Sequence, residues 1–425
     1  MLLTIAITLP LFIILGVPLG FAILASSLSA LLIDGNLNMM VAAQRVFSGF
    51  DSFSLLAIPL FLLAGSIMAA GGLSDRLVTF ANALVGRFRG GLGISNILAS
   101  VMFGGISGSA VADTSAIGRT FIPAMTQSGY PARFAVATTV ASAPLSPIIP
   151  PSIAWILYGY LTDTSILQLF IAGIVPAFLW ALTMIGVVVW KAKKENYPVH
   201  GRVNRAVLLS TMKAAVFALL LPVFVIVGIR MAVFTVTEAS AIAVLYALFV
   251  GALIYRELTW LKLWNCFKYT VQATAVVMII IGAANLFAWV LAYEQAPARV
   301  ASWAMGLSDN PIIFLLIINV VLLVIGTFME VNAAKIMTLP ILFPLVMQFG
   351  IDPVHFGVII TANLCLALMT PPVGIVLALA CKIGDVPLEQ GTVAVMPFFL
   401  AGVFVVLALT LFPGLSLWLP SLIIG

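Results

Sequence analysis

Long apolar runs recur along the whole chain, and each is long enough to cross a lipid bilayer. A helical crossing takes about 20 apolar residues. Runs of this length predict spans near residues 3–33, 52–72, 133–160, 165–190, 210–233, 237–255, 271–293, 354–381 and 392–419. Only 8% of the residues are charged, against roughly 25% in soluble domains, so an ordinary water-facing surface cannot be built. We therefore predict an all-α polytopic membrane protein that the lipid bilayer surrounds.

Two further apolar stretches are interrupted near their middles. The stretch 92–122 is broken at Gly104–Ser109, and the stretch 311–350 is broken at Gly326–Glu330. Each pattern predicts a re-entrant helical hairpin, which enters and leaves the membrane on one side. Non-helical backbone at membrane depth is tolerated only where protein or a water-filled cavity satisfies it. Both breaks are therefore candidate functional sites.

The second broken stretch repeats the spacing of the first, which indicates an internal repeat. Gly105 corresponds to Gly326, and Pro123 corresponds to Pro344. Later landmarks also correspond, at the cost of one inserted residue: Gly129–Pro131 with Gly350–Pro353, Phe134 with Phe356, and Pro150-Pro151 with Pro371-Pro372. Each predicted unit is a hairpin followed by a span that two prolines break.

Loop charges predict how the two copies are oriented, because Lys and Arg accumulate on the cytoplasmic side. A cytoplasmic N-terminus places 14 of the 19 basic residues inside, and these are Arg76, Arg87, Arg89, Arg133, Lys191, Lys193, Lys194, Arg202, Arg205, Lys213, Arg256, Lys262, Lys268 and Lys382. In this frame the first hairpin opens from the cytoplasm and the second from outside. The repeat is predicted to be inverted.

Inverted repeats with broken helices indicate a secondary transporter whose site lies near the middle of the membrane. An interrupted helix exposes unpaired N–H and C=O groups, so it can bind ions without a formal charge. Proline also frees the carbonyl one turn before it. Such carbonyls, with the side chains of Ser142, Ser146, Asn363 and Thr370, are hard oxygen ligands suited to sodium. The alternative is that these prolines only kink their helices.

Asp113 is the functional candidate of the first hairpin, because a carboxylate is costly inside a membrane. It lies in an unusually polar segment that also contains Ser107, Ser109, Thr114 and Ser115. Hydroxyls in such a segment can also bond back to their own helix. For Asp113 the alternative is a structural charge pair with Arg119.

In the second hairpin, Glu330, Asn332 and Lys335 occupy the matching part. The alternative there is that Glu330 and Lys335 neutralise each other, since charges within membranes usually pair.

Several other segments have simpler interpretations. Glu238, Glu294 and Arg299 are predicted at the outer face, where they contact a partner protein or form a solvated rim. The basic run Lys191–Arg205 is predicted to be a cytoplasmic loop. The segment Tyr255–Tyr269 resembles an interfacial amphipathic helix with aromatic anchors.

The sequence lacks the motifs of the main soluble functions. It has no phosphate-binding loop, no zincin helix and no dinucleotide-binding fingerprint in its proper context. Three cysteines and two histidines are too few for a disulfide framework or a zinc-enzyme core. The net charge of +5 comes from loop residues that set membrane orientation, so no nucleic-acid partner is expected. We predict a transporter that is not an enzyme and does not use ATP directly.

Four segments carry a resemblance to a known family over essentially the whole chain. They are Ile58–Gly65, Gly104–Asp113, Ile148–Ser152 and Met369–Gly374. Together they resemble the large membrane subunit (DctM-like, M subunit) of tripartite ATP-independent periplasmic, or TRAP, transporters. The resemblance implies residence in the bacterial inner membrane and sodium-coupled uptake of a small organic acid, such as a C4-dicarboxylate, sialic acid or a related sugar acid. It also implies two partners: a periplasmic binding protein that delivers the substrate, and a small membrane subunit, expected as a separate chain.

The resemblance further implies an elevator mechanism, in which a transport domain slides against a scaffold. The transport domain is expected at 91–163 and 310–385, and the scaffold at 1–90, 164–300 and 390–425. Carried over by position, one sodium site is expected at Ser107, Ser109 and the break Ser142–Pro147, which includes Ser146. A second is expected at Gly326, Thr327, Asn363 and Thr370. The substrate is expected near Ser109, Asp113, Glu330 and Asn332.

Two rival readings remain open from the sequence. A self-sufficient sodium-coupled anion symporter would share the inverted repeat but need no binding protein. A membrane enzyme or channel is disfavoured, because no activated nucleophile or metal set is visible, and a channel needs no paired inverted hairpins.

Overall fold

The computed structural model describes residues 1–35, 39–85, 88–197, 205–307, 310–371 and 373–424, with the side chains of 301, 303–305 and 307 left out. Over these residues the secondary structure is helical and contains no strand, which confirms the predicted all-α class. The first half contains α1 (Leu2–Ile14), α2 (Leu19–Asp34), α3 (Met39–Ser48), η1 (Phe53–Leu56), α4 (Ala57–Ala70), α5 (Leu73–Val85), α6 (Gly91–Ser107), α7 (Ala110–Gln127), α8 (Ala132–Ser142), α9 (Leu145–Ile148), α10 (Ile153–Thr162) and α11 (Ile166–Lys194). The second half contains α12 (Arg205–Arg230), α13 (Val236–Phe249), η2 (Val250–Ile254), α14 (Trp260–Tyr293), α15 (Ala296–Leu307), α16 (Pro311–Phe328), α17 (Val331–Gln348), α18 (Pro353–Ala367), α19 (Ile375–Gly384), α20 (Leu388–Leu411) and α21 (Gly414–Ile424).

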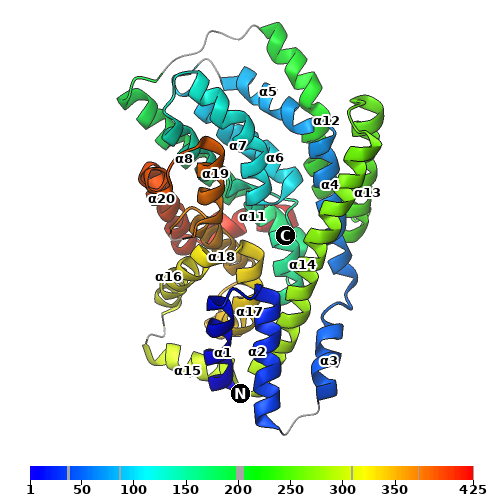
Figure 1. Cartoon of the computed structure of the whole chain (residues 1–425), viewed down its shortest axis with the longest axis vertical. Helices are drawn as coiled ribbons and strands as arrows, with labels where there is room; N and C mark the ends of the chain where they lie inside the picture. The colour runs from blue at the N-terminus through cyan, green and yellow to red at the C-terminus, as the bar shows by residue number, and fades with distance from the viewer. Residues whose placement is uncertain (36–38, 86–87, 198–204, 308–309, 372, 425) are drawn as a thin grey trace.

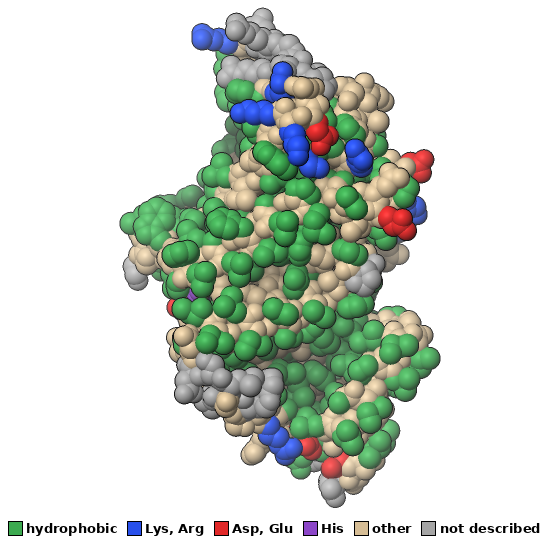
Figure 2. Space-filling model, turned by 90° about the vertical axis from the view of Figure 1, so that its left-hand side faces the viewer, with side chains coloured by type: hydrophobic (Ala, Val, Ile, Leu, Met, Phe, Trp, Pro, Cys, Tyr) green, Lys and Arg blue, Asp and Glu red, His purple; other side chains and the backbone are tan. Residues whose placement is uncertain are grey.

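The described helices have the lengths and the surface of a membrane protein. Eight helices within the described residues are long and apolar enough to span a bilayer, and 132–148 with 153–162 forms a further candidate span bent by 44°. On the face that Figure 2 shows, charged side chains gather in the upper part and at the lower end, and the surface between them is mostly apolar. This apolar band is the part that lipid would cover.

The first 34 residues fold differently from the prediction of one span at 3–33. They form α1 and α2, which lie side by side (Figure 1) and are joined by a turn in which Gly16 has a φ of +79°. The N-terminal amino group lies 3.8 Å from Glu294 Oε1. The predictions that Met1 is cytoplasmic and that Glu294 lies at the outer face therefore cannot both be correct.

Two further span predictions are corrected. The predicted interfacial helix at Tyr255–Tyr269 is not separate, because residues from Trp260 onward form the first turns of the continuous 34-residue helix α14. The predicted final span at 392–419 is two helices, α20 and α21. Pro413 lies between them, and helical backbone is disfavoured at the residue that precedes a proline.

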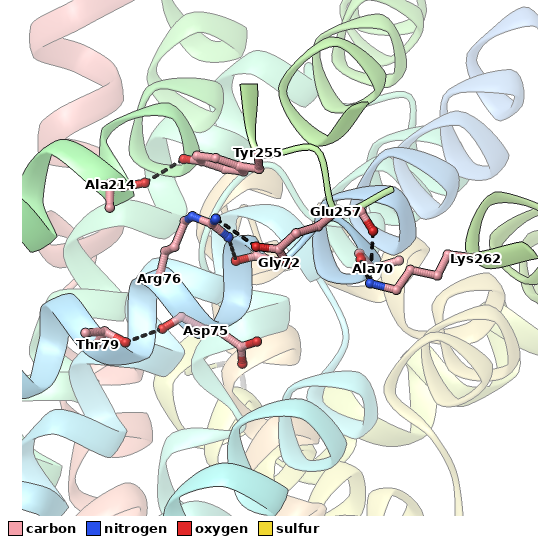
Figure 3. A network of polar contacts seen from close by, with 9 residues as sticks. All are labelled: Ala70, Gly72, Asp75, Arg76, Thr79, Ala214, Tyr255, Glu257 and Lys262. Atoms are coloured by element: carbon pink, nitrogen blue, oxygen red, sulfur yellow. Dashed lines mark hydrogen bonds and ion pairs between the residues drawn. The ribbon is translucent and has the colours of Figure 1, made fainter. Parts of the chain in front are cut away.

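A polar corner joins the end of α4 to the starts of α5 and α14 (Figure 3). Arg76 forms an ion pair with Glu257 at 2.7 Å, and its guanidinium lies 3.8 Å from the centre of the Tyr255 ring. Lys262 Nζ donates a hydrogen bond to the Ala70 carbonyl at 3.1 Å. Cations placed at a helix C-terminus satisfy its unpaired carbonyls, so this corner fixes the direction in which α5 leaves α4.

Helix packing separates two groups of elements. Helices α2, α3, α4 and α13 pack around α14 or one another, whereas α6 to α10 and α16 to α19 pack together with α11 and α20. The second group contains both predicted hairpins, α6–α7 and α16–α17, and both proline-broken spans. Its core includes the fully buried side chains of Trp155, Trp180 and Phe398.

Candidate functional site

The first hairpin breaks at Gly108, as the sequence predicts for this segment. Gly108 has a φ of +61°, a left-handed conformation that glycine adopts without strain. Ser109 then caps α7, because its side chain accepts a hydrogen bond from Ala112 N at 3.4 Å. Ser107 Oγ lies 3.4 Å from the Ser109 nitrogen. The two serines therefore line one tight turn at the tip of the hairpin.

Asp113 is fully buried in a network that links α6, α7 and α8. Ser100 Oγ donates to Asp113 Oδ2 at 2.8 Å and lies 3.0 Å from Ser142 Oγ. Ser142 Oγ also lies 3.1 Å from Asn96 Oδ1, and the Asn96 amide donates to Thr139 Oγ1 at 2.7 Å. This network positions the carboxylate of Asp113 beside the break that follows Ser142.

The predicted alternative of an Asp113–Arg119 pair is wrong within the described structure. Asp113 is buried and faces Ser100, whereas Arg119 is exposed on another side of the same helix, and no ion pair joins them. Thr114 does bond back to its own helix, at 2.8 Å from the Ala110 carbonyl.

Two buried oxygens beside the first break have no hydrogen-bond partner among the described residues. They are Asp113 Oδ1 and Ser146 Oγ, which meet hydrogen-bond geometry with no described residue, although the Ser146 side chain lies close enough to interact with the Asp113 carboxylate. Buried polar atoms without partners are rare and often mark a bound ion or water. A carboxylate and a hydroxyl are hard oxygen donors, which fit a sodium ion.

The second hairpin breaks at Met329–Glu330, again as predicted. Glu330 caps α17, because its Oε2 accepts from Asn332 N at 2.8 Å and from Ala333 N at 3.3 Å. The Asn332 amide donates to Glu330 Oε1 at 3.1 Å, which leaves Asn332 Oδ1 without a partner among the described residues. A carboxylate at a helix N-terminus is stabilised by the free N–H groups and the helix dipole.

Lys335 forms no direct ion pair with Glu330 in the described structure, although the two charges attract each other at longer range. Its fully buried ammonium donates to the Ala154 carbonyl at 2.9 Å and to Thr361 Oγ1 at 2.7 Å. The rings of Trp155 and Tyr158 lie 5.3 and 5.9 Å from Nζ, a distance at which aromatic faces attract cations. Lys335 therefore connects α17 of the second hairpin with α10 and with α18.

A second unpartnered oxygen group lies in α18. The Asn363 amide donates to the carbonyl and the side-chain oxygen of Asn319, at 3.0 and 2.9 Å, and Asn319 donates to Thr410 at 2.8 Å. Asn363 Oδ1 is buried and has no partner among the described residues.

The other residues predicted for the second sodium site lie near the break between α18 and α19, where Gly374 N donates to the Thr327 carbonyl. The Thr327 hydroxyl donates to the Val324 carbonyl of α16 at 2.7 Å. The Thr370 hydroxyl, just past the end of α18, donates to the Ala367 carbonyl at 2.6 Å, so each oxygen retains lone pairs. Gly326 packs against Ala367, where an added Cβ would approach within 2.5 Å. Pro372, a landmark of the predicted repeat, lies outside the described residues.

A cavity of about 530 Å³ lies at the tip of the first hairpin, against α4 and α14. Ser107, Ser109 and Arg119 line it, with Ser66 of α4 and Tyr269 of α14. Asp113, Glu330 and Asn332 do not, so the predicted substrate residues are not brought into one cavity. The sequence prediction gave Arg119 no binding role. The position of Arg119 on the same hairpin as the polar segment is the sequence feature that could have indicated such a role.

The three predicted partner contacts lie in separate places. Glu238 is exposed in a capping box with Thr235, whose N–H and hydroxyl donate hydrogen bonds to its carboxylate. It borders a cavity of about 800 Å³ that Asp163 also lines. Glu294 lies beside the N-terminus, and Arg299 is exposed on α15.

Comparison with known proteins identifies the family. Residues 6–415 match the family described as the tripartite ATP-independent periplasmic transporter, DctM component. The chain is 39% identical to the sialic acid TRAP transporter large permease protein SiaM of Vibrio cholerae, over 96% of each chain. It is 39% identical to the C4-dicarboxylate TRAP transporter large permease protein DctM of Pseudomonas aeruginosa, over 89% of each.

A solved structure shares the fold at low sequence identity. The YdaH transporter of Alcanivorax borkumensis superposes with a TM-score of 0.64 over 90% of each chain, at 16% identity. The family match and the relatives cover nearly the whole sequence, and so the chain belongs to the large permease (DctM component) family of TRAP transporters.

Proposed function

We propose that this chain carries out sodium-coupled uptake of a small organic acid that a periplasmic binding protein delivers, with a small membrane subunit as its second partner. The observation that carries the sodium proposal is the set of buried, unpartnered oxygens beside both broken helices: Asp113 Oδ1, Ser146 Oγ and Asn363 Oδ1. The relatives named for sialic acid and for C4-dicarboxylates support an organic acid as substrate. Two transported sodium ions are proposed, one at each break.

An inverted arrangement of the two units is part of the proposal. The pair α6–α7 lies in the upper half of the molecule and α16–α17 in the lower half (Figure 1), which supports hairpins that open from opposite sides. On the face that Figure 2 shows, Lys and Arg gather more at the upper end, whereas the N-terminus lies at the lower end (Figure 1). By the positive-inside rule we place the N-terminus outside, which replaces the cytoplasmic position predicted from the sequence.

For an elevator movement, the packing suggests a different moving body from the predicted one. Helices α11 and α20 pack on α6, α8 and α18. Thr410 of α20 also accepts the hydrogen bond of Asn319. We therefore propose that α11 and α20 move with 91–163 and 310–385, rather than belonging to the scaffold.

Arg119 is proposed to bind the carboxylate of the substrate. It lines the cavity at the tip of the first hairpin with four serines and Tyr269, and no ion pair occupies its guanidinium within the described structure. Guanidinium binds carboxylate through two parallel hydrogen bonds, whereas hydroxyls bind sugar or hydroxy groups.

Arg119→Gln is expected to raise the KM for the organic acid at least about tenfold, because a charge-assisted hydrogen bond contributes about 1.5–3 kcal/mol. The sodium concentration for half-maximal uptake should change far less. Uptake measured against substrate and against sodium separates the two effects. Arg133→Gln, a basic residue outside this cavity, serves as the control, and equal KM values in Arg119→Gln and wild type would remove Arg119 from the site.

Asn363→Ala is expected to lower sodium-stimulated uptake about tenfold, since one neutral oxygen ligand contributes about 1–2 kcal/mol. Thr370→Val should act in the same direction. The control is Thr338→Val, because the Thr338 hydroxyl bonds to the Ala334 carbonyl of its own helix, away from the break. Unchanged sodium dependence in both site variants would exclude the second site.

The test of the whole proposal is uptake of a radiolabelled organic acid into proteoliposomes that hold this chain and its small subunit. A sodium gradient and the cognate binding protein are each added or omitted. We expect uptake only when both are present. Uptake without the binding protein would instead identify a self-sufficient symporter, and uptake without a sodium gradient would refute sodium coupling.

A further inference from the structure

The two helices of the second hairpin are separated where those of the first are not. Helices α6 and α7 pack closely, whereas α16 and α17 touch at few points. A cavity of about 360 Å³ is lined by both α16 and α17. The hairpin is held at its base by Phe314 and Phe349, whose stacked rings have centres 4.1 Å apart. The separation is therefore a defined cavity with a closed base.

The lining of this cavity is apolar on every side. Ile317, Ile318 and Val321 of α16 line it at intervals of one and three residues, and Ile341 and Leu345 of α17 lie four residues apart. Such spacing places side chains on one face of a helix. The one hydroxyl in the lining, on Thr338, donates to the Ala334 carbonyl at 2.7 Å. A single hydroxyl cannot supply the roughly two to four polar partners that a buried water needs, so we expect this apolar cavity to stay dry.

The cavity opens toward the part of the surface that lipid covers. Ile317 and Val321 border it and are 41% and 44% exposed. Figure 2 shows the side of the molecule that carries α15 and α16, with a mostly apolar surface between the charged ends and a hollow in its lower half. Leu9, Phe287 and Val300 close the cavity from α1, α14 and α15.

We propose that one acyl chain of a phospholipid occupies this cavity, between α16 and α17. An empty cavity forfeits dispersion contacts along its whole lining, and the surrounding bilayer supplies hydrocarbon chains at this depth. A cavity of about 360 Å³ is too small to hold even two turns of a helix about 10 Å across, so a helix of the small subunit does not fill it. Arg299, exposed and one residue before Val300, offers a cation to the lipid phosphate at the outer end.

The test uses purified protein in nanodiscs of phosphatidylethanolamine that carries a diazirine on one acyl chain. After illumination, proteolysis and mass spectrometry map the labelled residues. We expect labels on α17, at Ile341 and Leu345, which face the cavity. Val321→Trp fills the mouth and should lower labelling of α17 about tenfold, the equivalent of about two buried methylene groups.

The matched control is Val320→Trp, at the neighbouring position, which is 64% exposed and does not line the cavity. In Val320→Trp the lipid probe should label α17 as strongly as in the wild type. Ile341→Trp fills the cavity from the opposite wall and should reproduce the loss if Val321→Trp folds poorly. Equal labelling of α17 in the filling variants and the control, or labels on α17 that the small subunit removes when added, would overturn the proposal. The assay needs neither substrate nor sodium, so its outcome is independent of the proposed transport function.

Discussion

Asp113→Ala is expected to raise the sodium concentration for half-maximal uptake about a hundredfold, equivalent to about 3 kcal/mol. Asp113 is a fully buried carboxylate with one oxygen bonded to Ser100 and the other without a partner in the described structure. A cation there gains a charged ligand that water does not screen. Uptake into proteoliposomes, measured over a range of sodium concentrations, gives the shift directly.

Thr114→Val is the matched control for Asp113→Ala. Thr114 is the next residue on α7 and is also buried, but its hydroxyl bonds to the Ala110 carbonyl of its own helix. The sodium dependence of Thr114→Val should stay within about twofold of the wild type, because a hydroxyl that bonds only to its own helix contributes little to a neighbouring site. Ser100→Ala removes the hydrogen bond that Ser100 donates to Asp113. It should raise the sodium concentration for half-maximal uptake less than Asp113→Ala does. Wild-type sodium dependence in Asp113→Ala would exclude a sodium site at this carboxylate.

Thr361→Val is expected to lower the free energy of unfolding by about 3 kcal/mol, because it deprives the buried Lys335 ammonium of one of its two oxygen partners. The change in shape is small, so the loss reports the unpaired donor rather than a cavity. Unfolding by sodium dodecyl sulfate titration in mixed micelles measures the effect. Thr338→Val, at a buried threonine of α17 that bonds only to its own helix, should cost far less.

The double variant Thr361→Val/Lys335→Met should recover most of that stability. Replacing both members of a buried polar pair by apolar groups is often neutral, whereas removing one partner is costly. Recovery in the double variant would establish that the lost energy belongs to the Lys335 contact. A double variant less stable than Thr361→Val alone would show that the lysine contributes packing or other contacts that methionine cannot replace.

Much of the architecture could be predicted from the sequence because apolar runs and their breaks are local signals. The breaks at Gly108 and at Met329–Glu330 lie within the segments predicted for them. The N-terminal segment is the exception, because its single apolar run conceals a turn between α1 and α2. Gly16 and Pro18 were the available signals, but glycine and proline also occur inside membrane helices.

The partners of buried polar groups could not be predicted, because sequence proximity is a poor guide to them. Lys335 lies five residues from Glu330, yet its ammonium donates to Ala154, 181 residues away, and to Thr361. Asp113 likewise contacts Ser100 rather than Arg119. The Lys335 contacts depend on how α10, α17 and α18 pack, and the Asp113 contact depends on how α6 packs on α7.

The contact between Lys335 and Ala154 also has a consequence for biosynthesis. The ribosome delivers Ala154 before Lys335, so the acceptor can already lie in the membrane when the lysine arrives. A lysine that entered hydrocarbon without an acceptor would be held back at the interface, because its insertion costs several kcal/mol. The order of the two halves along the gene therefore matters: a circularly permuted chain that begins near residue 310 would have to insert its buried cation before the group that receives it exists.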